Sequence, residues 1–352
     1  MPSRFVSSLL MLVALAGPVV AADPALSLLQ PSALDREVDA AVVRAVSFLA
    51  ESQRPSGGWL LDSYNGETTS LASLSLMALL AAGHAPGDEP YAGTFRRGVG
   101  YLLDHQQPTG LIIDKFEHGP LYCHGISTLL LAEIAGQTEP QQAAAVRKAL
   151  EQAVHALLEA QVVPKDERHA GGWRYTLSSN DSDLSVTAWQ LLALRGAKNV
   201  GCDIPADAID RAVGYVKRCA NRQRGGFAYQ PGNGPSTTMT AAGITALQVC
   251  GVTDSVELTA SVPYLATRLP RYRDRYFFYG NYYSCVALHQ HGGDVWANSK
   301  EAAFRELLLR QSRDGSWSAA DGSEKGYGKP YATSLAVLAL TVEYGYLPIY
   351  QK

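Results

Sequence analysis

Gln53-Arg-Pro-Ser-Gly57-Gly58-Trp59 is the stretch that decides the fold of this chain, because the same pattern returns near its other end as Gln311-Ser-Arg-Asp-Gly315-Ser316-Trp317. Weaker copies lie between the two, at Gln106-Gln-Pro-Thr-Gly110-Leu111-Ile112, Gly171-Gly172-Trp173 and Gly225-Gly226-Phe227. Self-similarity at a spacing of roughly 50 residues is typical of repeat architectures. The pattern therefore predicts one structural unit that is repeated along the chain.

Two kinds of helix are expected in each repeat. First helices, which carry charge on one face, are expected for example over residues 40–53, 147–161, 208–221 and 300–311. Second helices carry very few charges and are rich in Ala, Ser, Thr and Leu; they are expected over residues 69–82, 124–135, 185–195, 237–250, 282–291 and 331–344. A helix that is apolar on all sides must be buried on all sides, and small side chains let such helices approach closely.

Six amphipathic helices alternating with six buried helices predict an all-α fold, the (α/α)6 toroid, in which an outer ring surrounds an inner ring. An open solenoid of helix pairs would show the same alternation. Closure is favoured because the first and last repeats carry the best-formed motifs, whereas an open array is expected to degrade at its ends. The motif residues are expected to be scaffold: Gln bonds loop backbone, Gly permits positive φ, and the aromatic ring covers the junction between repeats.

The composition fits a folded, exported protein. Hydrophobic residues make up 47% and charged residues 18% of the 352-residue chain, and its net charge of −3 predicts no general attraction to nucleic acid or to an anionic membrane. Arg4, the apolar run over residues 5–20 and the small residues Val20-Ala21-Ala22 predict a signal peptide over residues 1–22, followed by one toroid over residues 23–352 without a transmembrane segment. A periplasmic or extracellular location follows.

In an oxidising compartment one or two disulfides are possible. The five cysteines show no Cys-x-x-Cys spacing, so no zinc ribbon or thioredoxin-type site is expected. Cys202 and Cys250 are the favoured pair, because each falls just beyond the end of consecutive repeats.

The run Phe48-Leu49-x-x-x-Gln53-x-x-x-Gly57-x-Trp59 resembles the glutamine–tryptophan repeat of squalene–hopene cyclases and protein prenyltransferase β-subunits. The resemblance covers essentially the whole mature chain and implies a single (α/α)6 barrel, one half of a two-barrel triterpene cyclase. Further segments resemble a secreted bacterial subgroup of single-barrel proteins, namely Tyr122-Cys-His124-Gly125, Gly171-Gly-Trp-Arg174-Tyr175, Asp183-Leu-Ser-Val-Thr187 and Gly225-Gly-Phe-Ala-Tyr229.

The chemistry of this superfamily carries over only in part. Where the cyclases have Asp-x-Asp-Asp-Thr-Ala, this chain has Asp183-Leu184-Ser185-Val186-Thr187-Ala188, so Ser185 replaces the carboxylate that donates the proton. A hydroxyl group cannot protonate an alkene as a carboxylic acid can, which argues against squalene cyclisation by that route. Of the prenyltransferase zinc ligands only Cys285 remains, and one thiolate does not make a zinc site. No metal or other cofactor is expected.

The first turns of the inner helices hold the candidate site residues. Six parallel helix N-termini converge at one end of a toroid, where free N–H groups and helix dipoles favour anions. If the protein is an enzyme, Asp183 and His124 are the candidate acid–base pair. Each also has a structural interpretation, Asp183 as a helix cap and His124 as a hydrogen-bonded residue of a helix start. The candidate ligand-binding residues are Tyr122, Cys123, Trp173, Tyr175, Thr187, Tyr229, Thr238, Tyr282, Tyr283, Cys285 and Tyr331.

The fifth repeat replaces the turn motif with Arg271-Tyr-Arg-Asp-Arg275-Tyr-Phe-Phe-Tyr279. Its arginines can clamp a diphosphate and its aromatic rings can line an apolar pocket; alternatively, Arg–aromatic stacking closes this end of the barrel.

Three hypotheses for function follow. The leading one is an exported toroid whose central cavity binds an isoprenoid or other apolar small molecule. The first alternative is a non-enzymatic scaffold of the cell envelope with a protein partner. The second is a carbohydrate-active enzyme, for which Asp181, Asp183 and Glu117 are the candidate carboxylates.

Overall fold

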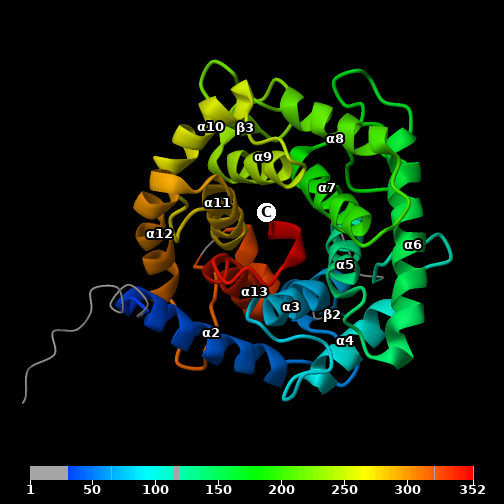
Figure 1. Cartoon of the computed structure of the whole chain (residues 1–352), viewed down its shortest axis with the longest axis vertical. Helices are drawn as coiled ribbons and strands as arrows, with labels where there is room; N and C mark the ends of the chain where they lie inside the picture. Colours follow the sequence, from blue (N-terminus) through cyan, green and yellow to red (C-terminus); the bar gives the residue numbers. More distant parts are fainter. Residues whose placement is uncertain (1–30, 65, 115–118, 321, 352) are drawn as a thin grey trace, which may run out of the picture.

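The computed structural model describes residues 31–64, 66–114, 119–320 and 322–351. In these residues twelve α-helices alternate between an outer and an inner ring (Figure 1). The outer helices are α2 (Ala33–Glu51), α4 (Ala92–Asp104), α6 (Pro140–Val162), α8 (Ala206–Arg218), α10 (Val256–Ala266) and α12 (Gly293–Leu308). The inner helices are α3 (Thr69–Ala81), α5 (Pro120–Ile134), α7 (Leu184–Asn199), α9 (Thr237–Val249), α11 (Phe277–His291) and α13 (Gly328–Leu340). The predicted all-α toroid of six helix pairs is confirmed.

Short strands and 3-10 turns connect the helices. Two antiparallel hairpins pair β1 (Leu60–Leu61) with β2 (Gly66–Glu67) and β3 (Phe227–Ala228) with β4 (Pro235–Ser236). Each hairpin leads from a motif turn into the next inner helix, so it sets where that helix begins. The 3-10 turns are η1 (Asp62–Tyr64), η2 (Ser323–Tyr327) and η3 (Pro348–Tyr350).

The ring is closed. Each inner helix packs against two inner neighbours, and the last inner helix, α13, packs against the first, α3. In the outer ring α12 packs against α2. Lys300 of α12 bonds Asp35 of α2 at 2.9 Å, and Gln311 donates to the carbonyl oxygen of Ala41 at 2.8 Å. These contacts exclude the open solenoid that the helix alternation alone would have allowed.

Where the motif has its glutamine, it holds one repeat to the next. The Gln53 side-chain amide donates to the carbonyl of Gly57 in its own turn and to the carbonyl of Thr94 in the next outer helix, both at 3.0 Å. The indole N–H of Trp59 donates to the Leu49 carbonyl at 2.8 Å. Because buried carbonyls need partners, these bonds fix the turn. The same bonds recur from Gln161, Trp173, Gln311 and Trp317.

The motif glycine is needed for a close approach between repeats. At Gly315 φ is +85°, and a Cβ atom there would lie only 2.4 Å from the carbonyl oxygen of Arg44 on α2. An L-residue would be strained by this φ and would collide with the neighbouring backbone. The other motif glycines face the next outer helix in the same way; they are Gly57, Gly110, Gly171 and Gly225.

The segment after α13 turns back into the ring, and its red ribbon lies at the centre of Figure 1. The backbone N–H of Ile349 donates to the Glu133 carboxylate at 3.3 Å, and the Tyr350 carbonyl accepts from Gln290. The hydroxyl groups of Tyr350 and Tyr282 are hydrogen-bonded to each other. Glu133 and Gln290 stand near the C-terminal ends of α5 and α11, so η3 fills this end of the inner ring.

The predicted pair of cysteines is wrong. All five cysteines are free, and Cys202 and Cys250 face different neighbours. The Cys202 thiol lies in the field of Arg147 on α6, whereas the Cys250 thiol lies in the field of Arg195 on α7.

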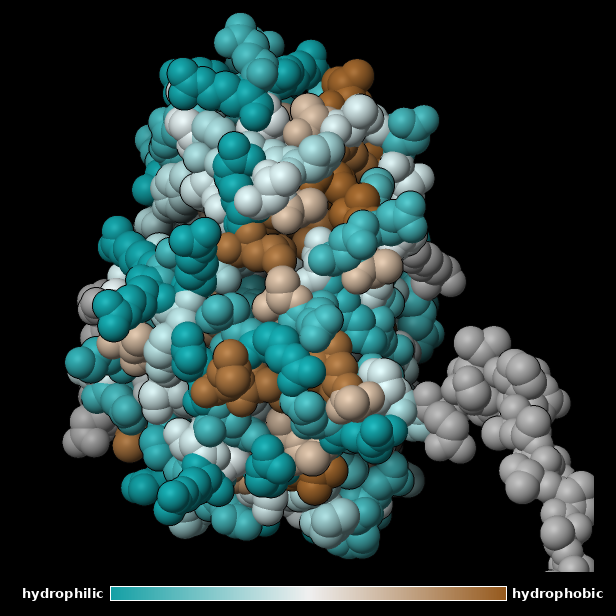
Figure 2. Space-filling model, turned by 90° about the vertical axis from the view of Figure 1, so that its left-hand side faces the viewer, coloured by the Kyte–Doolittle hydropathy of each residue, from teal (hydrophilic) through white to brown (hydrophobic). Residues whose placement is uncertain are grey.

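The outer surface is mixed, and the side formed by α10 and α12 shows separate hydrophobic patches among hydrophilic residues (Figure 2). The predicted signal peptide over residues 1–22 lies outside the described residues. Among the helices that the structure describes, none has the length and apolar character needed to cross a membrane.

Candidate functional site

Four tyrosines gather where α5, α7, α9 and α11 begin. Tyr122 lies on α5, Tyr175 precedes α7, Tyr229 lies between β3 and β4, and Tyr279 lies on α11. The Tyr175 and Tyr229 hydroxyls are 2.5 Å apart, and the Tyr122 and Tyr175 ring centroids are 6.1 Å apart. The Tyr279 hydroxyl reaches the carbonyl oxygen of Ser185 at 3.5 Å. We call this group, together with the first turn of α7, the mouth of the inner ring.

Asp183 caps α7 at the mouth. Its Oδ1 accepts from the backbone N–H of Val186 at 2.9 Å and from the Ser185 hydroxyl at 2.6 Å, so the predicted capping role is confirmed. Its Oδ2 is buried and has no hydrogen-bond partner among the described residues. Burial raises the pKa of Asp183 above its ordinary value. The side chain thus combines an oxygen fixed by the helix start with a buried oxygen that Arg174 approaches to 3.8 Å.

Arg174 is the cation of the mouth, and it was not among the residues predicted for the site. Its guanidinium forms an ion pair with Asp181, and its Nε lies 3.8 Å from Oδ2 of Asp183. The guanidinium carbon also stands 5.0 Å from the Tyr175 ring centroid and 5.7 Å from that of Tyr229, within cation–π range. One feature of the sequence could have identified it: Arg174 directly follows the motif Gly171-Gly172-Trp173, where the chain runs from the turn toward the start of the inner helix.

Ser185 lies in the first turn of α7, beside Asp183. It donates to Asp183 and accepts from the Tyr122 hydroxyl, so a chain of hydrogen bonds runs from Tyr122 through Ser185 to Asp183. Burial raises the pKa of Tyr122 well above its ordinary value. At neutral pH Tyr122 therefore remains a hydrogen-bond donor, and the chain orients the hydroxyl of Ser185 toward Asp183.

His124 belongs to the scaffold. Its Nδ1 accepts from the backbone N–H of Ile112 and its Nε2–H donates to the Ala153 carbonyl, both at 3.1 Å. It is fully buried, and burial lowers its pKa to about 4, so the imidazole is neutral and has no nitrogen left for acid–base chemistry. In three other repeats a threonine takes the place of His124, because its hydroxyl accepts from the backbone N–H of the aromatic residue in the motif. These threonines are Thr187, Thr240 and Thr333.

Below the mouth, aromatic rings fill the axis. Tyr282 stacks on Trp189 with ring centroids 5.9 Å apart, and Tyr283 meets the same indole edge-on at 5.4 Å. Within the described residues, neither the Tyr283 hydroxyl nor Nε1 of Trp189 has a hydrogen-bond partner. Among the described residues, the axis at this depth is therefore packed with aromatic rings where an open central cavity was expected. Three further candidates, Cys123, Trp173 and Cys285, are buried.

Glu324 is a second buried carboxylate that the sequence analysis did not select. It accepts from the backbone N–H groups of Phe278 and Tyr279 at 3.0 Å each and from the Tyr331 hydroxyl at 3.2 Å. It thereby caps α11 from another repeat, and burial raises its pKa. Tyr331 is thus held against α11. The half-buried Thr238 lies in the first turn of α9, next to Gly280 of α11.

The arginine-rich stretch of the fifth repeat packs across its end of the barrel. The Arg275 guanidinium carbon lies 5.2 Å from the ring centroid of Tyr276, and that of Arg310 lies 4.7 Å from the ring centroid of Tyr272. The Tyr272 hydroxyl donates to the carbonyl of Ser318 at 2.7 Å. Arg–aromatic stacking, the structural alternative for this stretch, is what the contacts show.

Together these features define the class: a closed (α/α)6 toroid with a buried carboxyl group at the mouth of its inner ring. No family model and no curated protein matches the chain. Several solved structures share its fold. A variant of the type II terpene cyclase MstE from Scytonema, in complex with geranylgeranyl dihydroxybenzoate, is 15% identical over 88% of this chain and 97% of its own, with a TM-score of 0.57.

Two glycoside-hydrolase structures are similar to the same extent. The GH76A α-1,6-mannanase of Salegentibacter sp. HEL1_6 is 10% identical over 86% of this chain and 98% of its own, with a TM-score of 0.65. A possible GH105 member from Klebsiella pneumoniae subsp. pneumoniae MGH 78578 is 15% identical over 96% and 99%, with a TM-score of 0.58. Identities this low show the shared toroid, and function has to be argued from the site.

Proposed function

We propose that the mouth is the ligand site of an exported toroid, that its ligand is an isoprenoid or other apolar compound, and that Asp183 is its acid–base residue. One observation carries this proposal: Oδ2 of Asp183 is buried without a hydrogen-bond partner among the described residues, while Oδ1 is fixed by the helix start. A buried polar atom without a partner costs free energy, and such atoms concentrate at functional sites. A ligand at the mouth would supply the partner.

The wall of the mouth suits an apolar ligand. Tyr122, Tyr175, Tyr229 and Tyr279 bring aromatic faces from four parts of the chain. Such faces bind hydrocarbon surfaces and stabilise positive charge that develops near them. The type II terpene cyclase of the same fold has a geranylgeranyl ligand, and we take that ligand class as the first candidate for this chain.

The chemistry of the mouth is proton transfer. Asp183 in its neutral form donates its proton to an alkene carbon or an oxygen of the ligand, which leaves a carboxylate and a cationic ligand. The nearby Arg174 and the Ser185 hydroxyl stabilise that carboxylate. It then takes back a proton from the neighbouring carbon of the ligand, so the residue is regenerated. His124 has no part in this scheme because both of its nitrogens are bonded to backbone groups.

A carbohydrate is the second candidate ligand. It is favoured by one observation: Arg174 contacts both Asp181 and Asp183, so two carboxylates lie at one mouth. Paired carboxylates are what glycoside hydrolysis uses. Glu117, the third carboxylate considered for this role, lies outside the described residues. A non-enzymatic scaffold is the third candidate, and the stacked rings below the mouth favour it.

The test begins with the purified chain. Lipids are extracted from it and identified by mass spectrometry, and geranylgeraniol, geranylgeranyl diphosphate and α-1,6-mannobiose are titrated into the extracted protein. We expect a prenyl compound to bind and to be converted. Cleavage of the disaccharide without binding of a prenyl compound supports the carbohydrate candidate. Conversion of none of the three, with no prenyl compound bound and no lipid extracted, supports the scaffold.

Substitution of Asp183 by asparagine tests the acid directly. Asn caps a helix as well as Asp does, so Asp183→Asn is expected to keep the fold and the binding of the ligand while turnover falls by about 10²-fold or more. Asp181→Asn is the matched control, because Asp181 faces Arg174 from a more exposed position and leaves Oδ2 of Asp183 in place. Equal turnover in the two variants removes Asp183 from the mechanism.

A further inference from the structure

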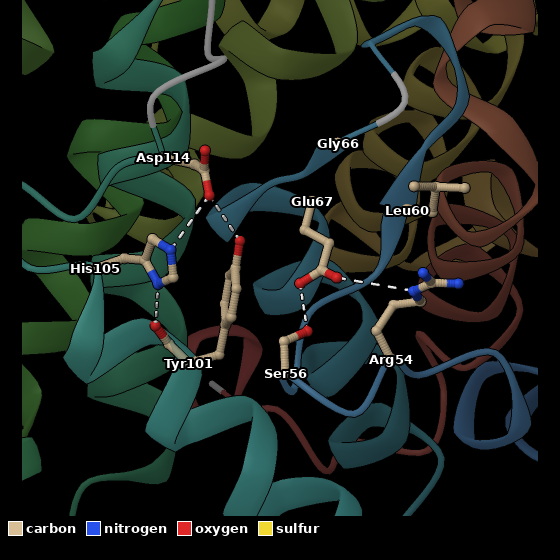
Figure 3. A pocket seen from close by; sticks show the side chains of 8 residues that line it. All are labelled: Arg54, Ser56, Leu60, Gly66, Glu67, Tyr101, His105 and Asp114. Atoms are coloured by element: carbon tan, nitrogen blue, oxygen red, sulfur yellow. Dashed lines mark hydrogen bonds and ion pairs between the residues drawn. The ribbon is translucent and has the colours of Figure 1, made fainter.

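A second hollow opens at the rim of the ring, between the turns of the first two repeats (Figure 3). Its volume is about 490 Å³, which is within the range of small-molecule sites. Its polar side chains come from the first motif turn, β2, the end of α4 and the segment before α5; they are Arg54, Ser56, Glu67, Tyr101, His105 and Asp114. None of these residues belongs to the mouth, so the hollow is a separate feature of the molecule.

One wall of this rim hollow is a fixed cluster around Asp114. The Tyr101 hydroxyl donates to Oδ2 of Asp114 at 2.9 Å, and Nε2 of His105 lies 3.3 Å from the same oxygen. Nδ1 of His105 donates to the carbonyl oxygen of Tyr101 at 2.7 Å. The Asp114 side chain is only 9% exposed, so most of the cluster is buried and one edge of it faces the hollow.

The opposite wall is built on Glu67 (Figure 3). The Ser56 hydroxyl donates to Oε2 of Glu67, and Nε of Arg54 lies 3.8 Å from Oε1. Gly58 keeps the space between the walls open, because a Cβ atom there would lie 2.5 Å from Oε2 of Glu67 and 3.1 Å from the Tyr101 ring. The glycine of the motif turn thus leaves room beside two polar side chains.

We propose that the rim hollow binds an uncharged polyhydroxy ligand, a mono- or disaccharide. Each wall carries a carboxylate beside a hydrogen-bond donor, Glu67 beside Arg54 and Asp114 beside Tyr101, so an anionic ligand would meet a carboxylate on both sides. Hydroxyl groups both donate and accept. A sugar can therefore donate to Glu67 and Asp114 and accept from Arg54, with charge-assisted hydrogen bonds on both sides. This inference does not depend on what the mouth binds.

The experiment is a titration of the full chain with glucose, mannose and maltose, observed by saturation-transfer NMR, with sulfate and spermidine as charged probes. We expect saturable binding of at least one sugar and of neither charged probe. Glu67→Gln and Asp114→Asn are each expected to weaken sugar binding by about tenfold or more, because each removes a charged acceptor. Binding of a charged probe alone, or of nothing, overturns the proposal.

Two further variants locate the sugar. Glu159→Gln alters an exposed carboxylate on α6 and is expected to leave binding unchanged. Tyr175→Ala removes part of the wall of the mouth and is also expected to leave sugar binding unchanged; loss of sugar binding in this variant alone places the sugar in the mouth and overturns the rim assignment. Thermal unfolding of every variant is recorded, and Glu67→Gln, which keeps an acceptor for Ser56, decides the outcome where Asp114→Asn is unfolded.

Discussion

The side-chain amide of Gln311 donates to the carbonyl oxygen of Ala41, 2.8 Å away, although 270 positions separate the two residues in the sequence. The same amide donates to Gly315 at 2.9 Å, and its oxygen accepts from Arg44. The last repeat thus holds the first one with the same bonds that Gln53, Gln106 and Gln161 make to their next outer helices. Closure fixes the spacing of the inner helix starts, and with it the position of Asp183.

Loss of this bond should open the ring locally. Gln311→Ala removes the donor of the buried Gly315 carbonyl oxygen and the bond from Gln311 to the Ala41 carbonyl of α2, and we expect the free energy of unfolding to fall by about 2–4 kcal/mol. Urea titration followed by circular dichroism measures it. Gln152→Ala, on the exposed face of α6, is the control and should change stability by less than about 0.5 kcal/mol. Equal stabilities of the two variants would show that Gln311 does not close the ring.

The close approach at the motif glycine can be separated from its backbone strain. Gly315 and Gly201 both have positive φ, +85° and +79°, but a Cβ atom collides with Arg44 only at Gly315 and meets nothing within 4 Å at Gly201. We expect Gly201→Ala to cost about 1–2 kcal/mol from φ alone. Gly315→Ala should cost about 1–3 kcal/mol more, from overpacking. Thermal unfolding of the two variants gives the difference, and equal midpoints would contradict the collision.

The architecture could be predicted because its causes are local in the sequence. The motif that begins at Gln53 predicts the turn, and the alternation of amphipathic and apolar helices predicts the two rings. Helix starts set by distant residues could not be predicted. The expected helix over residues 282–291 begins at Phe277, since Glu324, 46 positions beyond Phe278, accepts the N–H groups of its first turn.

The candidate site was predictable to the same degree. Asp183 was identifiable as the cap of a helix start, because capping is a local pattern. Arg174 was missed because its role at the site depends on contacts with Asp181 and Asp183 that form only in the folded turn. His124 was assigned a possible acid–base role because sequence does not show that Ile112 and Ala153 occupy both nitrogens.

Glu133 should make the protein less stable as pH rises. Burial raises its pKa to about 8, against an ordinary value of about 4.3. Between these values the folded chain keeps a proton that the unfolded chain releases, so the free energy of unfolding falls with pH by up to about 1.4 kcal/mol per unit. Glu133→Gln keeps an acceptor for Ile349 and removes the titration. In urea titrations from pH 4.5 to 8, the free energy of unfolding of the variant should rise relative to that of the unmodified chain. Stabilities that change equally with pH in the two proteins would contradict this.

His124 should act in the opposite direction and in a more acidic range. Burial lowers its pKa to about 4, below the ordinary value of about 6.5, so the unfolded chain binds a proton that the folded chain does not. Stability is therefore lost as pH falls from about 6.5 to 4. In His124→Thr, threonine takes the place it already has at Thr187 and keeps an acceptor for Ile112, but the bond to the Ala153 carbonyl of α6 is lost.

We expect His124→Thr to be about 1–3 kcal/mol less stable at pH 7 and to lose less stability on acidification than the unmodified chain. Urea titrations at pH 7, 6, 5 and 4.5 measure both effects. Ligand binding at the mouth should be the same in the two proteins, since His124 contacts backbone groups of its own repeat and the next helix. Loss of turnover in a folded His124→Thr variant would return the residue to the reaction and leave Asp183 as one half of an acid–base pair.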